Sequence, residues 1–425
     1  MIPFEQNLDR CRDDRAGTGG LSNDQFQNAL SAAQRGTSRI RQSLTDPTWP
    51  LLQLPAESCD LLSLSDIAGL IKGQSDQVVV LGTGGSSLGG QTLATLAPRW
   101  AKPSVVFADN LDPHAFAELL TASDFKRTTF LVISKSGGTP EPIAQMIAVI
   151  DAFRARGLSD EIGARVIAIS QPGENPLRRL AERFSIAVLD HDPALGGRFS
   201  VLSCVGLLPA AILGLDIGAV RAGAKAVLDE TIATPDSAPA QGAAMIAALA
   251  ADRGVTDLVV MPYASKLERL GMWYRQLLGE SLGKGGRGLT PVAALGPVDQ
   301  HSMLQLFMDG PPNKMITIIT ADIEGSGPPL PADLADDPSL AFLSGRAIGD
   351  LVAAQGRATM DALARNGRPV RHIRVPKIDE HTLGGLMMHF MLETIILGDM
   401  LEVDPFDQPA VELGKQLTRD YLEQS

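Results

Sequence analysis

Three hydroxyl side chains, Ser134, Ser136 and Thr139, stand close together in the segment SKSGGT at 134–139, directly after a short apolar run. The apolar run predicts a buried strand, and the segment T-P-E that follows it suits the first turn of a helix with a hydroxyl cap. Glycines let backbone N–H groups approach a ligand closely, and a helix N-terminus favours an anion. We therefore predict a phosphate-binding loop here, with an ordinary polar turn as the alternative.

A second glycine-rich loop, GTGGSSLGG at 82–90, follows another predicted strand. Its G-x-G spacing, with Asp109 closing the next strand, suggests a dinucleotide-binding turn, but the third glycine of that fingerprint is missing. It is not a P-loop, because no GK[ST] follows. A loop that offers Gly85 and Ser86 to a sugar phosphate explains the composition equally well.

Four further side chains have types and positions that an enzyme could use. Arg198 follows two glycines and precedes an apolar segment, where a guanidinium needs an anionic partner. Glu280 ends a predicted helix, where the dipole disfavours an acid unless the carboxylate serves as a base. His301, between polar residues, could carry protons. A structural ion pair, a solvated helix end or a surface position explains each of these residues alone, and Lys415 as well.

The composition restricts the class of protein. The chain has 425 residues, of which 44% are hydrophobic and 20% charged, so two well-buried domains are expected and disorder is not. A formal net charge of −12 argues against nucleic acid and anionic membranes as partners. Three widely spaced cysteines form no metal-binding pattern, and neither a signal core nor a membrane-spanning segment is evident. We expect a cytoplasmic protein without a structural metal.

The elements that must position these residues alternate between strands and helices. Strands are predicted at 77–81, 104–108, 130–133 and 165–169, and a second block has strands at 256–261, 314–320 and 370–375. Such alternation predicts parallel sheets with helices on both faces and ligands at the carboxyl ends of strands. Residues 1–20 are expected to pack loosely, and 284–296 to form a loop.

Six motifs follow one another between residues 77 and 425: GTGGSSLGG at 82–90, ISKSGGTPE at 133–141, GGRFSVLS at 196–203, GESLGK at 279–284, DQHSMLQ at 299–305 and FDQPAVELGK at 406–415. In these motifs the chain resembles the phosphoglucose isomerase family of the sugar-isomerase (SIS) superfamily. Ala410, Pro193 and Ser87 depart from the family pattern and leave its catalytic set intact.

The resemblance implies an α/β fold with two three-layer α/β/α sandwich lobes, mainly parallel sheets, and helical N- and C-terminal segments. We expect a helical or irregular segment at 1–60, a first SIS-type domain with the phosphate loops at 61–235, a second at 236–403, and a C-terminal loop and helix at 404–425. The family is usually homodimeric.

The resemblance also implies roles for individual residues. Glu280 matches the base that moves a proton between C1 and C2, and Arg198 the cation that stabilises the enediolate. His301, supplied by the partner subunit, and Lys415 match the residues that open the sugar ring. The residues that match substrate-binding positions are Gly85, Ser86, Ser134, Lys135, Ser136, Thr139, Gln276 and Gln408.

The implied reaction interconverts glucose 6-phosphate and fructose 6-phosphate, a step of glycolysis and gluconeogenesis, by ring opening and a cis-enediolate proton transfer. It requires no cofactor or metal. The alternatives are a non-catalytic sugar-phosphate sensor and a dinucleotide-dependent oxidoreductase. The joint presence of Glu280, Arg198, His301 and Lys415 argues against the sensor. No motif decides whether mannose 6-phosphate is also accepted.

Overall fold

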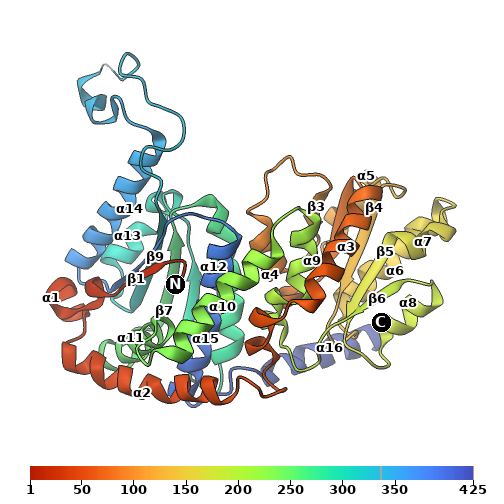
Figure 1. Cartoon of the computed structure of the whole chain (residues 1–425), viewed down its shortest axis with the longest axis horizontal. Coiled ribbons are helices and arrows are strands. Elements are labelled where there is room, and N and C mark those ends of the chain that lie inside the picture. The colour runs from red at the N-terminus through yellow and green to blue at the C-terminus, as the bar shows by residue number, and fades with distance from the viewer. Residues whose placement is uncertain (336, 425) are drawn as a thin grey trace.

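The computed structural model describes residues 1–335 and 337–424. Asp336, within the predicted second domain, and Ser425, at the end of the predicted C-terminal segment, lie outside the described residues. Two lobes lie side by side, each around its own sheet (Figure 1). The prediction of two α/β lobes is therefore confirmed.

The sheet of the first lobe is entirely parallel. Its strands lie in the order β3 (Ser104–Phe107), β2 (Gln77–Leu81), β4 (Thr128–Ile133), β5 (Val166–Ser170) and β6 (Ala187–Asp190). Successive residues of a strand point to opposite faces, so Val78 and Val80 enter one hydrophobic cluster and Val79 and Leu81 another. The order reverses direction between β2 and β4, the place where such sheets bind ligands.

Helices cover both faces of this sheet and make it the middle of three layers. One face carries α3 (Cys59–Gln74), α4 (Leu88–Ala94) and α9 (Cys204–Ile212). The other carries α5 (Pro113–Ala122), α6 (Pro140–Ala155), α7 (Ile162–Arg165) and α8 (Pro176–Arg183).

The sheet of the second lobe has the order β1 (Glu5–Asn7), β10 (Val370–Val375), β9 (Lys314–Ala321), β7 (Asp257–Pro262) and β8 (Thr290–Ala293). Only β1 is antiparallel. One face is covered by α13 (Leu304–Asp309) and α14 (Ile348–Arg365), the other by α11 (Ala238–Arg253), α12 (Glu268–Leu282) and α15 (Glu380–Met400). Outside these pack α2 (Asn23–Gln42) and α10 (Ile217–Ala233), while α1 (Asp13–Ala16) contacts α14.

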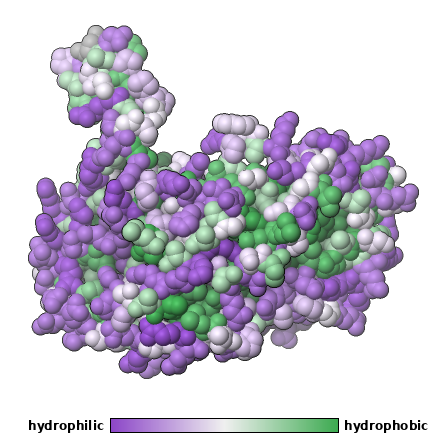
Figure 2. Space-filling model, in the orientation of Figure 1, coloured by the Kyte–Doolittle hydropathy of each residue, from purple (hydrophilic) through white to green (hydrophobic). Residues whose placement is uncertain are grey.

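One continuous hydrophobic cluster joins the lobes, because α3 and α9 of the first and α12 and α15 of the second contribute to it together. Among the described residues, α15 alone is long and apolar enough to cross a membrane, and 89% of its apolar stretch is buried inside the protein. On the face shown in Figure 2, hydrophobic side chains gather over α3, α9 and α10, and polar side chains cover the rim.

Two of the expectations about local structure were wrong. The predicted loop at 284–296 contains β8, which is hard to recognise because it is a four-residue edge strand with a proline. Residues 1–20 do not pack loosely, since β1 pairs with β10 through Glu5 and Asn7. A three-residue strand is too short to show an alternating pattern, so its partner β10 decides its conformation.

Candidate active site

The predicted phosphate loop connects β4 to α6 at the carboxyl edge of the first sheet. Gly137 has a φ of +62°, and a Cβ there would lie 1.9 Å from the side-chain oxygen of Asn175, so only glycine fits. In the described part of the chain, the hydroxyl of Ser134 is buried without a hydrogen-bond partner. A buried polar atom of this kind normally has a partner, which a bound ligand would supply.

The other polar residues of this loop remain close to solvent. Ser136 accepts a hydrogen bond from the backbone N–H of Gly138 at 3.2 Å. Thr139 occupies the N-cap of α6, but its side chain makes no capping bond, so that detail of the prediction was wrong. Burial lowers the pKa of the Lys135 ammonium, and the positive charge of Arg198 lowers it further. An anion bound beside Lys135 would favour its charged form and so oppose both of these effects on its pKa.

The first glycine loop lies against the second lobe and against the segment before Arg198. Gly84 has a φ of +58°, and a Cβ on it would come within 2.8 Å of the Gln276 amide nitrogen. A Cβ on Gly85 would lie 2.2 Å from the carbonyl carbon of Gly197. This close approach places Gly85 and its neighbour Ser86 beside the arginine segment.

The acid that suggested dinucleotide binding is engaged within the protein. Gln91 donates a hydrogen bond to the Asp109 carboxylate at 2.7 Å and another to Ser87 at 2.8 Å. Thr83 donates to the backbone carbonyl of Asp109. These contacts give Asp109 a structural role in tying the loop to α4.

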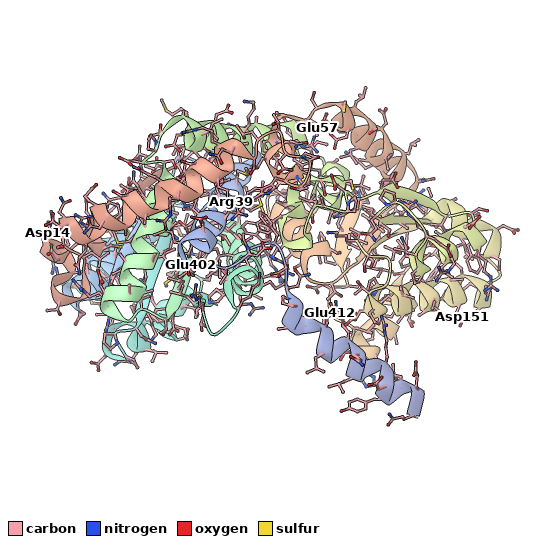
Figure 3. The ribbon with its side chains drawn as sticks, turned by 90° about the horizontal axis from the view of Figure 1, so that it is seen from below. Asp14, Arg39, Glu57, Asp151, Glu402 and Glu412 are labelled. Carbon is pink, nitrogen blue, oxygen red and sulfur yellow. The ribbon has the colours of Figure 1, made fainter. Side chains whose placement is uncertain are left out.

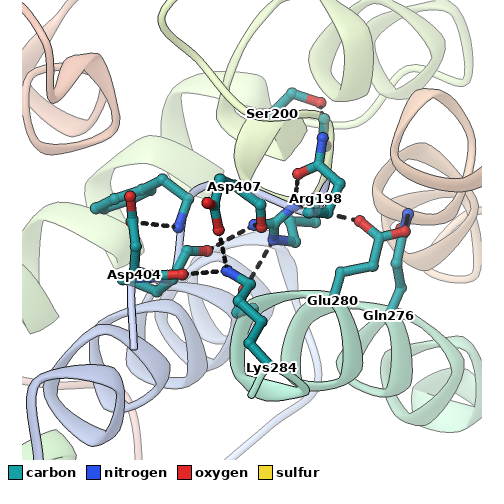
Figure 4. A network of polar contacts seen from close by, with 12 residues as sticks. Arg198, Ser200, Gln276, Glu280, Lys284, Asp404 and Asp407 are labelled. Atoms are coloured by element: carbon teal, nitrogen blue, oxygen red, sulfur yellow. Dashed lines mark hydrogen bonds and ion pairs between the residues drawn. The ribbon is translucent and has the colours of Figure 1, made fainter. Parts of the chain in front are cut away.

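Arg198 lies at the centre of a polar network that joins both lobes to the C-terminal segment (Figure 4). Its side chain is 2% exposed. The guanidinium donates to the Ser281 hydroxyl at 2.8 Å and to the Gln408 amide oxygen at 2.7 Å. It also donates to the backbone carbonyls of Pro405 and Asp407, at 2.6 and 3.0 Å. Burial lowers the pKa of Arg198, while the nearby Glu280 carboxylate opposes that effect.

Glu280 lies in the last turn of α12 and meets Arg198 at 3.3 Å. Gln276, one turn earlier on the same helix face, donates to the other carboxylate oxygen at 3.0 Å. The carboxylate is thus held from two sides while its side chain stays 36% exposed. The structure therefore brings Arg198, Gln276, Glu280 and Gln408 together, as the sequence motifs suggested.

Lys284 closes the motif GESLGK at 279–284, but nothing in the sequence predicts a role for it. It is only 16% exposed and contacts the Asp407 carboxylate at 2.5 Å and the carbonyl of Asp404. This contact fastens the segment that carries Gln408 against the end of α12. The only signal for it was that Lys284 closes the motif containing Glu280.

His301 lies away from this network. It follows β8 beyond the carboxyl end of the second sheet, whereas Glu280 lies near the amino ends of the strands. From Glu268 to Glu280, α12 covers about 18 Å at 1.5 Å per residue. The side chain of His301 is exposed, and its neighbour Gln300 anchors the turn by donating to the Tyr263 hydroxyl at 2.9 Å.

Lys415 is also separate from the network. It lies on α16 (Glu412–Gln424), which extends away from the lobes (Figure 3). Its ammonium donates to Glu412 of the same helix at 2.6 Å, and the side chain is 50% exposed. Almost every residue of α16 is exposed. In this conformation the described contacts do not bring Lys415 to Glu280.

Comparison with known proteins gives consistent sequence matches. The model of the family described as phosphoglucose isomerase matches residues 57–311. A glucose-6-phosphate isomerase of Rubrobacter xylanophilus is 37% identical over 412 residues, which cover 94% of each chain. One of Thermus thermophilus is 35% identical over 354 residues, covering 82% of this chain and 84% of the other.

Solved structures agree with the fold. A hypothetical protein from Thermus thermophilus superposes with a TM-score of 0.86 at 30% identity, and the alignment covers 99% of both chains. A glucose-6-phosphate isomerase from Chlamydia trachomatis superposes with a TM-score of 0.82 at 18% identity, covering 99% of this chain and 88% of the other. At that identity the second likeness shows the fold alone.

Proposed function

Because the chain belongs to the phosphoglucose isomerase family, we propose that its reaction, the interconversion of glucose 6-phosphate and fructose 6-phosphate, proceeds through a cis-enediolate with Glu280 as the base. The observation that carries this proposal is the contact of Glu280 with Arg198 at 3.3 Å and with Gln276 at 3.0 Å. A carboxylate, a fixed cation and a polar amide converge there beside two glycine-rich loops.

The phosphate group of the sugar binds in the loop 134–139. The hydroxyl of Ser134, which has no partner within the protein, and that of Thr139, which makes no capping hydrogen bond, donate to the phosphate. Lys135 supplies positive charge. Ser136, Gly85 and Ser86 complete this end of the site. Binding energy from the non-reacting phosphate positions the carbons that react.

At the reacting end, Glu280 removes the proton from one carbon and returns it to the next. Gln276 orients the carboxylate. The intermediate carries negative charge on oxygen, so the preorganised guanidinium of Arg198 stabilises it more than the neutral sugar. Gln408, held by Arg198 at 2.7 Å, is placed to bind sugar hydroxyls.

His301 takes part in ring opening from the partner subunit of a homodimer. Two observations support this. Within one chain, His301 lies beyond the carboxyl ends of the strands of the second sheet and Glu280 near their amino ends. Hydrophobic side chains gather on one face of the protein (Figure 2), and Leu62 and Leu70 of α3 are exposed to solvent. A second copy would supply the histidine and cover part of such a surface.

Lys415 assists ring opening once α16 folds back over the bound sugar. The segment between Gln408 and Glu412 is the hinge, because Arg198 and Lys284 hold the chain before it and α16 is exposed after it.

The protein acts in the cytoplasm. In support of this location, Cys11, Cys59 and Cys204 are all free thiols, as expected of a protein kept under reducing conditions. The division of the chain near residue 236 into two SIS-type domains remains part of this proposal, with α10, which precedes that residue, packed on α15 of the second lobe.

The test is Glu280→Gln, which keeps the shape and removes the base. We expect turnover of glucose 6-phosphate to fall by at least about 10²-fold, as for loss of a general base, while fructose 6-phosphate still binds in calorimetry. Glu118→Gln, at an exposed position of α5, is the matched control, because it removes the same charge far from the network. Near-normal turnover in Glu280→Gln would show that another group is the base. A wild-type chain that binds the sugar phosphate without converting it would instead favour the sensor.

A further inference from the structure

A cavity of about 750 Å³ lies at the ends of α4 and α12 that point away from Glu280. The residues that line it include Arg99 and Trp100 in the loop between α4 and β3, Lys266 in the turn just before α12, and Glu268 and Arg269 in the first turn of α12. That loop is the orange connection drawn between the two lobes in Figure 1. None of the residues assigned to the isomerase reaction lines this cavity.

Positive charge collects in this cavity although the chain as a whole carries a net charge of −12. Among the described residues that line it, Arg99, Lys266 and Arg269 are cationic and Glu268 is the single acid. Across the residues that the structure describes, no ion pair or side-chain hydrogen bond involves the guanidinium of Arg99 or Arg269. The Lys266 ammonium donates only to the backbone carbonyl of Leu96, at 3.2 Å. The protein therefore leaves this charge without an acidic partner of its own.

Two arginines elsewhere on the surface, Arg127 and Arg374, show the opposite arrangement. Arg127 holds Asp76 with two hydrogen bonds of 3.1 and 2.9 Å. Arg374 holds Asp322 in the same bidentate way, at 2.8 and 2.7 Å. Guanidinium groups form such pairs readily with carboxylates and with phosphates. The unpaired arginines at the cavity are thus available to an external anion.

The same cavity presents an aromatic surface. Trp100 is 82% exposed, whereas Trp273 is 1% exposed and Trp49 packs edge-on against Phe406 at 4.7 Å. Leaving a whole indole in water forgoes the burial that an aromatic side chain normally gains. An exposed indole beside cations is the combination that binds a base together with its phosphates.

The walls of the cavity are held in place by contacts between the lobes. Thr95 donates to the backbone carbonyl of Lys266 at 2.5 Å, and Thr92 donates to that of Arg269 at 3.1 Å. These bonds fix the end of α4 against the beginning of α12, whose positive dipole end lies there too. The site is preformed, and its volume falls in the range of small-molecule pockets.

We propose that this cavity is a second ligand site, which takes a nucleoside polyphosphate. Its phosphates bind Arg99, Lys266 and Arg269, and its base stacks on Trp100. The site is independent of the isomerase reaction, whose anion is the sugar phosphate held in the loop 134–139.

The test is calorimetric titration of the full chain with adenosine triphosphate, in the presence of saturating fructose 6-phosphate so that the phosphate loop is filled. We expect binding that Arg99→Ala/Arg269→Ala weakens by at least about tenfold, equivalent to about 1.4 kcal/mol. The matched control Arg35→Ala/Arg365→Ala, which removes two exposed arginines from α2 and α14, leaves the affinity unchanged.

A second comparison separates the base from the phosphates. Trp100→Ala is expected to weaken adenosine triphosphate and to leave the binding of inorganic tripolyphosphate unchanged. Three results would overturn the proposal: no binding at millimolar nucleotide with or without fructose 6-phosphate, binding only in the absence of fructose 6-phosphate, or equal losses in the two double arginine variants. The second would assign the nucleotide to the sugar-phosphate site, and the third would mean unspecific attraction. Glu280→Gln should retain nucleotide binding, so failure of the isomerase proposal is distinguishable.

Discussion

Changing Arg198 to lysine keeps the positive charge but removes the planar guanidinium group, whose several N–H donors hold together the network around Glu280. In the structure the guanidinium serves five acceptors: a hydroxyl, a carboxylate oxygen, an amide oxygen and two backbone carbonyls. A lysine ammonium has three N–H donors and a single point of attachment. At least two of the five acceptors therefore lose their donor.

The expected magnitudes follow from that count. A buried acceptor left without a partner costs about 1–3 kcal/mol, so Arg198→Lys should lower the free energy of unfolding by about 2–6 kcal/mol. The effect on catalysis is separate. Loss of one preorganised donor to a developing oxyanion lowers kcat by about 10²–10³-fold, and we expect that loss with a smaller change in KM.

A second arginine provides a matched control. The side chain of Arg221 is 2% exposed and pairs with Asp60, which is 36% exposed, as Glu280 is beside Arg198. It serves four acceptors, namely both oxygens of Asp60 and the carbonyls of Glu57 and Leu202. Arg221→Lys leaves at least one of them unpartnered, which corresponds to about 1–3 kcal/mol.

The assay is chemical denaturation of both variants, followed by initial rates with glucose 6-phosphate under conditions where each is folded. Both variants should lose stability, and only Arg198→Lys should lose kcat by the factor given above. If the two variants have the same kcat, Arg198 is a structural residue like Arg221, and the proposed stabilisation of the enediolate is refuted.

Three more outcomes can be checked. Gly137→Ala should raise KM for glucose 6-phosphate about tenfold with little change in kcat, because the new Cβ collides with Asn175 at a positive φ; an unchanged KM would contradict the role of that loop. Lys284→Met should lower kcat/KM by about tenfold by freeing Asp407, and initial rates equal to those of the wild type would show that this contact is dispensable. Burial lowers the pKa of His389 in the folded state. When the pH falls below about 6.5, this histidine therefore takes up a proton in the unfolded state but not in the folded state. The free energy of unfolding should then fall by up to about 1.4 kcal/mol per pH unit, and His389→Phe should flatten that slope in denaturation curves; a slope identical to that of the wild type would rule out this histidine as its source.

The strand, loop and helix around residues 134–139 could be predicted because their residues are contiguous. The apolar run of β4, the glycines after it and the start of α6 follow one another in the chain, and local patterns determine each of them. The strands β2 and β10 have the bounds expected from their apolar runs. The edge strands β1 and β8 could not be found in this way, because pairing with a neighbour rather than their own pattern makes them strands.

The contacts in the network around Glu280 could not be predicted from local sequence patterns. Arg198 reaches partners 82 to 210 positions away, on α12 and on the segment after α15. The motifs indicated that Arg198, Gln276, Glu280 and Gln408 belong to one site, but they carried no information about which atoms meet. They also grouped His301 and Lys415 with that set, whereas one folded chain separates both from it.

The sequence by itself determined the alternation of strands and helices, the glycine-rich loops and the kinds of side chain present at the site. These depend on neighbours within a few positions along the chain. Only the tertiary structure decided that Lys284 holds Asp407, that Asp109 is bound to Gln91, and that Arg99 and Trp100 share a cavity with the start of α12. Such contacts depend on how the two lobes pack, and packing is a property of distant segments together.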